Sequence, residues 1–134
     1  MTGKVLCFQI ETVAQKLIKI AKITHYHFLK KEPLLIWAPS AKAVQYVDKL
    51  LWEEPLEGFL PHKTANEECQ ELIVITEKDE NLNKAAFVIN LTAGVPKSHF
   101  STIYDFSETD KRALFEKKAK SYKDLGFLVE ERPS

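Results

Sequence analysis

An unbroken apolar run, Leu34-Leu35-Ile36-Trp37-Ala38, restricts the fold more than any other part of this sequence. Such a run suits a central strand buried on both faces, because a strand with one face in water alternates apolar and polar residues. Pro39 then ends the strand, and Ser40 is of a residue type that commonly caps a helix. Apolar residues recur at helical spacing over residues 41–51, so the segment predicts a buried strand followed by an amphipathic helix.

The N-terminal part of the chain predicts the same pair of elements. Residues 5–10 form a short run rich in strand formers, and Thr12 with Gln15 has the spacing of a helix capping box. Apolar positions then recur every three or four residues. We expect this helix to run from residue 12 to about residue 28, because Pro33 forbids its continuation.

Three more strands and a last helix are expected in the remainder of the chain. The strand candidates are apolar runs between turn-rich segments, at residues 72–76, 86–91 and about 102–106. The last helix is expected from residue 109 or 110 to about 125, because Gly126 is the usual residue at a left-handed helix end. Strands that alternate with helices predict one α/β domain over residues 1–134. Its fold is a three-layer α/β/α, Rossmann-like architecture with a mostly parallel sheet of about five strands.

The charge balance and the cysteines exclude several classes of protein. Lys plus Arg and Asp plus Glu each number 19, so no field of the whole molecule attracts a polyanion such as DNA. Cys7 and Cys69 are far apart and have no CxxC spacing, so we expect buried free thiols. Neither an export signal nor an apolar run of membrane-spanning length is seen, and a cytoplasmic location is expected by default.

The residue patterns of common enzyme and cofactor sites are missing. The chain has four glycines, and they do not form the phosphate-binding spacings of nucleotide enzymes. His25-x-His27 has no carboxylate that completes a metal ligand set. We therefore expect no catalytic residue, no metal and no cofactor. The alternative is a small Rossmann-like nucleotide-binding protein or enzyme of unknown substrate.

A segment rich in aromatic residues and proline, residues 51–62, follows the second predicted helix. It contains Trp52 and Phe59, together with Pro55 and Pro61, which stiffen the chain. A stiff segment that displays aromatic side chains loses little entropy on docking and often forms a binding hot spot. The other interpretation is that Trp52 and Phe59 cover the sheet edge of their own domain.

The last helix has an apolar stripe and a basic flank. Steps of 100° per residue gather one apolar stripe, which consists of Leu114, Phe115, Ala119, Tyr122 and Leu125. Arg112, Lys120 and Lys123 form a flank that includes Glu116, and this flank is either an anion site or a solvated surface. Lys111 and Lys118 lie near the stripe, where they could snorkel over the core edge or frame an apolar pocket.

Three stretches of this sequence carry a resemblance to a known family. Residues 48–62 contain, in order, an aspartate, a leucine-tryptophan pair, a proline and a phenylalanine-x-proline-histidine group. Tyr104-Asp105-Phe106 precedes the last helix, and Lys120-x-Tyr122 with Gly126-Phe127 lies at its end. In these stretches, and in the order of its elements over nearly the full length, the chain resembles the chi subunit family of bacterial DNA polymerase III.

The resemblance implies an adaptor without an active site of its own. It implies that the domain bridges the clamp loader, through the psi subunit, to the acidic C-terminal tail of single-stranded DNA-binding protein. In the family, the tryptophan and the phenylalanine-x-proline group serve the psi side, which also receives an alternative helicase partner. Trp52, Phe59 and Pro61 inherit that role, and any contact with DNA is expected to be indirect.

The resemblance also assigns a site for the acidic tail. The family holds the tail with basic residues of the last helix beside an apolar patch. Arg112, Lys120 and Lys123 match basic positions of the family, but its most important arginine is replaced here by Glu116. Lys111, Arg112, Lys117 or Lys120 must then take over from that arginine, or the tail binds weakly or elsewhere.

Overall fold

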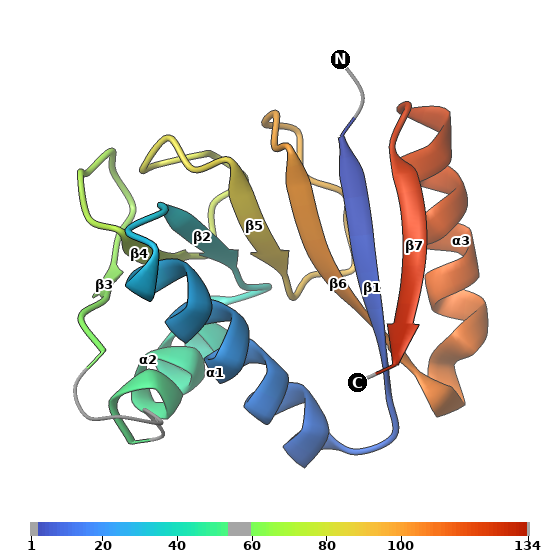
Figure 1. Ribbon diagram of the computed structural model, residues 1–134, viewed down its shortest axis with the longest axis horizontal. Coiled ribbons are helices and arrows are strands. Elements are labelled where there is room, and N and C mark those ends of the chain that lie inside the picture. Colours follow the sequence, from blue (N-terminus) through green and yellow to red (C-terminus); the bar gives the residue numbers. More distant parts are fainter. Residues whose placement is uncertain (1–2, 54–59, 134) are drawn as a thin grey trace.

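A computed structural model describes residues 3–53 and 60–133 of the chain (Figure 1). Within these residues the sheet has seven strands, in the order β3-β4-β2-β5-β6-β1-β7, and every neighbouring pair is parallel. The strands are β1 (Lys4–Ile10), β2 (Leu34–Trp37), β3 (Lys63–Thr64), β4 (Ile73–Thr76), β5 (Phe87–Asn90), β6 (Thr102–Glu108) and β7 (Leu128–Pro133). The helices are α1 (Val13–Leu29), α2 (Ala41–Glu53) and α3 (Arg112–Asp124), with a 3-10 turn at Thr109–Lys111 before α3.

The helix ends form as the sequence predicts. Thr12 caps α1, because its side chain accepts a hydrogen bond from the Gln15 N–H at 3.1 Å. The Ser40 hydroxyl accepts one from the Ala43 N–H at 3.1 Å at the start of α2. Gly126 follows α3 with a φ of 93°, the left-handed conformation that favours glycine.

The sheet separates two apolar layers, which confirms the predicted α/β/α architecture. In Figure 1, α1 and α2 lie on one side of the sheet and α3 lies beyond β7 on the other. Leu34 and Ile36 belong to the cluster that packs with α1 and α2, whereas Leu35 belongs to the cluster that contains Tyr122 of α3. All three are almost fully buried, so β2 is covered on both faces as its apolar run indicates.

Three details differ from the sequence prediction. The sheet has seven strands, not about five, because β3 is only two residues long and β7 carries charged residues that hide its strand character. Cys7 is buried as expected, but Cys69 is only half-buried. Leu114 and Leu125 are 67% and 63% exposed, so the predicted apolar stripe of α3 is wrong at these two positions.

The strand order places two diverging connections side by side. β1 and β6 are neighbours, yet the chain leaves β1 through α1 on one face and leaves β6 through α3 on the other. In parallel α/β sheets, ligands bind outside the carboxyl ends of strands at such a point. Among the described helices, none combines the length and the apolar character needed to cross a membrane.

Candidate partner-binding sites

Trp52 lies at the end of α2 and is 47% exposed. Its ring centroid lies 4.6 Å from that of His62, which immediately precedes β3. Pro61 is exposed, and Phe59 lies outside the described residues. Trp52 is thus half-exposed, and its ring packs beside His62 of its own domain.

His62 joins residues 60–62 to α2. Its Nε2 lies 2.8 Å from Asp48 Oδ1, and its Nδ1 lies 2.8 Å from the Leu60 carbonyl oxygen. Leu60 is buried in the core that α1 and α2 share. The contact between Asp48 and His62 therefore joins residues 60–62 to α2, and the Trp52 ring lies beside His62.

The basic flank of α3 consists of Arg112, Lys120 and Lys123. The Arg112 guanidinium is paired with the Glu131 carboxylate, lies 3.5 Å from Glu116 and donates a hydrogen bond of 3.2 Å to Ser107 Oγ. The Glu131 carboxylate, with a smaller effect of Glu116, raises the pKa of Arg112, and the guanidinium lowers the pKa of Glu131. Lys120 and Lys123 are exposed, and neither forms an ion pair within residues 3–53 and 60–133.

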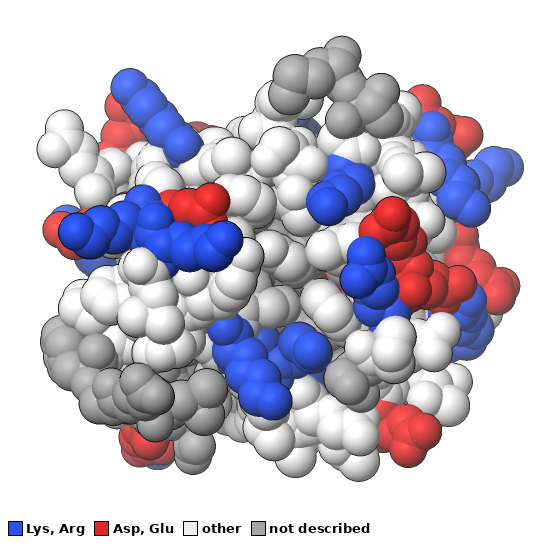
Figure 2. Space-filling view, in the orientation of Figure 1, with Lys and Arg blue, Asp and Glu red and all other residues white. Residues whose placement is uncertain are grey.

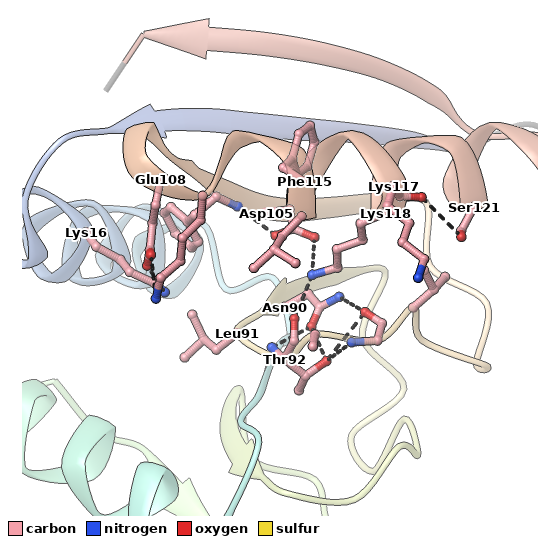
Figure 3. A pocket seen from close by; sticks show the side chains of 16 residues that line it. Lys16, Asn90, Leu91, Thr92, Asp105, Glu108, Phe115, Lys117, Lys118 and Ser121 are labelled. Atoms are coloured by element: carbon pink, nitrogen blue, oxygen red, sulfur yellow. Dashed lines mark hydrogen bonds and ion pairs between the residues drawn. The ribbon is translucent and has the colours of Figure 1, made fainter.

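A pocket of about 720 Å³ lies on another side of α3, at the carboxyl ends of β5 and β6 (Figure 3). It is bounded by α3, by the loop that follows β5 and by the first turn of α1. Its apolar lining includes Leu91, Val95, Phe106, Leu114 and Phe115, and its charged lining consists of Lys16, Lys111, Lys117, Lys118, Asp105 and Glu108. Lys111 and Lys118 both line this pocket, but its lining mixes apolar and charged residues and is not apolar as predicted.

The ion pairs of the pocket leave one lysine without a partner. Lys118 reaches from α3 to Asp105 Oδ2 at 2.8 Å, as Figure 3 shows, and also donates to the Thr92 carbonyl at 2.6 Å. Lys16 and Lys111 share Glu108, at 3.5 and 3.3 Å. The ammonium group of Lys117 has no ion pair or hydrogen bond to any described residue.

Asp105 is the centre of a buried polar network behind the pocket. Its carboxylate accepts hydrogen bonds from Tyr122 Oη at 2.6 Å and from the Phe106 N–H at 2.7 Å. Burial raises the pKa of Asp105, and the contacts with Lys118, Tyr122 and Phe106 partly offset this effect. Burial together with Asp105 also raises the pKa of Tyr122. Asp105, from the motif before α3, and Tyr122, from the motif within α3, are therefore hydrogen-bonded in the core, and both residues stabilise the fold.

A scan against protein families identifies the chain. The sequence-family model of the DNA polymerase III chi subunit, HolC, matches residues 4–130, which is nearly the whole sequence. The chain belongs to this family. Membership makes the protein an accessory subunit of the bacterial replicase and confirms the resemblance inferred from the sequence motifs. A search of the curated proteins finds no match to the chain.

The contacts and the exposure of the predicted residues separate them into two groups. Asp48, His62, Asp105 and Tyr122 form hydrogen bonds within the domain, so these motif residues stabilise the fold. Trp52, Pro61 and the lysines of the flank are exposed and stay predicted partner contacts. The sequence did not indicate that Lys117 and Leu114 line a pocket, because the residues opposite them come from a loop about 20 residues earlier.

Proposed function

We propose that this protein is a non-catalytic adaptor of the DNA polymerase III holoenzyme. It connects the clamp loader, through a psi subunit or another clamp-loader or helicase protein, to the acidic tail of single-stranded DNA-binding protein. The chi family match over residues 4–130 carries this proposal. A half-exposed Trp52 at the end of α2 and exposed lysines on α3 support it, because the tryptophan suits an apolar partner and the lysines suit an anionic one.

The distribution of charge argues against DNA as the direct partner. Figure 2 shows basic and acidic side chains both scattered over the visible face, in line with equal totals of 19 each. A protein that binds DNA without sequence preference neutralises several phosphates with a continuous basic surface. Single-stranded DNA-binding protein therefore provides the connection to the template in this proposal.

The psi side is tested by substituting Trp52. In the proposed function, Trp52→Ala weakens capture of a purified psi subunit at least about tenfold, because buried aromatic anchors often contribute about 2 kcal/mol or more. Tyr46→Ala is the matched control, since Tyr46 is a 56% exposed aromatic residue on the same helix. Binding would be measured by isothermal titration calorimetry at equal protein concentrations.

The melting temperature distinguishes a binding role of Trp52 from a core role. We expect Trp52→Ala to melt within a few degrees of the wild type, because about half of the side chain already faces water. Equal affinity of the Trp52→Ala and wild-type proteins for psi would refute the assignment. A large loss of melting temperature would place Trp52 in the core instead.

A nucleotide screen tests the proposed absence of catalysis. A protein stabilised by a nucleotide melts at a higher temperature when the ligand is in excess. We expect ATP, GTP, NAD and FAD to leave the melting temperature of this chain unchanged. A clear rise with any of them would favour a nucleotide-binding function over the adaptor role.

A further inference from the structure

We infer that His62 is the positioning residue of the psi side, and that it holds Trp52 and Pro61 in place as an imidazolium ion. Loss of its proton loosens this arrangement, so the affinity for a psi subunit falls as pH rises. This inference rests on the proposed function and names a residue that regulates one half of it.

Both ring nitrogens of His62 face hydrogen-bond acceptors. Nδ1 lies 2.8 Å from the Leu60 carbonyl oxygen, and Nε2 lies 2.8 Å from Asp48 Oδ1. A carbonyl oxygen and an ionised carboxylate accept hydrogen bonds but do not donate them. A neutral imidazole has a single N–H group, whereas an imidazolium has two. Both contacts are therefore complete only when His62 is protonated beside an ionised Asp48.

Asp48 is the charged partner of His62. Within the part of the chain that the structure describes, it is the charged side chain in ion-pair contact with the ring. Lys49 on α2 pairs with Glu53, and Lys63, the next residue in the chain, is exposed. The His62 side chain is fully buried, but Asp48 is 37% exposed. Water therefore reaches the carboxylate that shares the proton, and the protonation of the pair follows the pH of the solution.

The two described residues of the predicted psi side both depend on His62. Pro61 stands between Leu60 and His62, and the side chain of Leu60 is buried in the core. The Trp52 ring lies beside the imidazole at a centroid distance of 4.6 Å. A cation within about 6 Å of an indole ring is attracted to its π electrons. The proton of His62 therefore acts on the segment that carries Pro61 and on the placement of Trp52.

Deprotonation weakens the psi side in two ways. The Nε2 lone pair then faces the Asp48 carboxylate oxygen at 2.8 Å, and the two groups repel each other. The attraction between the ring and Trp52 declines as well. Residues 60–62 and the indole are then held less firmly, and a partner that must order them binds more weakly. Histidines change charge between about pH 5 and 8, so the effect lies near neutral pH.

Asp48→Asn tests the inference because it removes the need for the second proton. The asparagine amide donates to Nε2 of a neutral imidazole, while the Nδ1–H still donates to the Leu60 carbonyl. Purified psi subunit is titrated calorimetrically against wild type and Asp48→Asn between about pH 5.5 and 8, and thermal melts verify folding. We expect the wild-type affinity to fall at least about fivefold over this range and that of Asp48→Asn less than about twofold.

Trp52 fluorescence reports the proton without a partner. The chain has two tryptophans, so a Trp37→Phe background leaves Trp52 as the single indole. A protonated imidazole quenches a neighbouring indole more strongly than a neutral one, so we expect the emission to rise with pH. His62→Gln, which places no titrating group beside the indole, should abolish this rise.

Parallel pH profiles of psi affinity for the wild type and Asp48→Asn would overturn the inference and leave the psi side of the proposed function intact. A Trp52 emission that does not change with pH would overturn it in the same way. If the wild type binds no psi at any of these pH values, the psi side of the proposed function fails and the inference fails with it.

Discussion

The buried pair of Lys118 and Asp105 provides a quantitative test of how the two C-terminal motifs stabilise the fold. The side chains are 11% and 4% exposed, and their charged atoms lie 2.8 Å apart. Lys118→Met keeps most of the aliphatic stem but removes the ammonium group, so little cavity forms. The change leaves a buried carboxylate without its cation, which commonly costs about 3–5 kcal/mol.

The lower end of that range applies here. Asp105 still accepts hydrogen bonds from Tyr122 Oη and the Phe106 N–H after the substitution, so we expect a loss of about 3 kcal/mol. An unfolding entropy of about 2.1 cal/mol/K per residue corresponds to about 0.3 kcal/mol/K for this chain. The melting temperature should therefore fall by about 10 °C.

The loss should also depend on pH. Burial raises the pKa of Asp105 above its ordinary value of 3.8. A group with a raised pKa in the folded state contributes stability that is complete below the unfolded pKa and is lost as pH rises through the folded one. The Lys118→Met substitution removes a contact that lowers this pKa, so the gap from wild type should be small near pH 4 and widen toward neutral pH.

Urea unfolding followed by circular dichroism measures these changes, and the Asp105→Asn background serves as the control. Asparagine carries no charge at this position, so Lys118→Met should cost less than about 1 kcal/mol in that background. An equal cost in both backgrounds would show that Lys118 acts through packing or through its bond to Thr92. The ion-pair argument would then be refuted.

Three further predictions concern single residues, namely Gly3, Gly126 and His27. A side chain at Gly3 would place its Cβ 2.7 Å from a Phe127 ring carbon, so Gly3→Ala should cost about 1–3 kcal/mol by overpacking. A Cβ at Gly126 would have no atom within 4 Å, so only the left-handed φ opposes Gly126→Ala, which should cost about 1–2 kcal/mol. Equal urea midpoints for the wild type and either glycine variant would contradict this reasoning. Burial lowers the pKa of His27 below 6.5, so its contribution to stability is complete above that pH and declines as pH falls. His27→Gln should therefore flatten the fall in unfolding free energy between about pH 7 and 5, and an identical fall in both proteins would show that other groups cause it.

Local sequence signals were sufficient for the elements and for the general architecture. The apolar run of β2 predicted burial on both faces, and the structure confirms it with Leu34, Leu35 and Ile36. Thr12 and Gly126 marked helix ends because capping and left-handed backbone depend on one or two neighbouring residues. The motifs around Trp52 and α3 were also sufficient for the family.

The tertiary structure decided which of these residues are free to bind. The spacing of α3 could not show that Leu114 is exposed, because exposure depends on whether another segment covers that side of the helix. Nor could it show that Arg112 meets Glu131 or that Lys118 meets Asp105, since these partners come from β7 and β6. Helical periodicity fixes the direction of a side chain from its own axis, whereas charge pairing and pockets depend on segments that only the folded chain brings together.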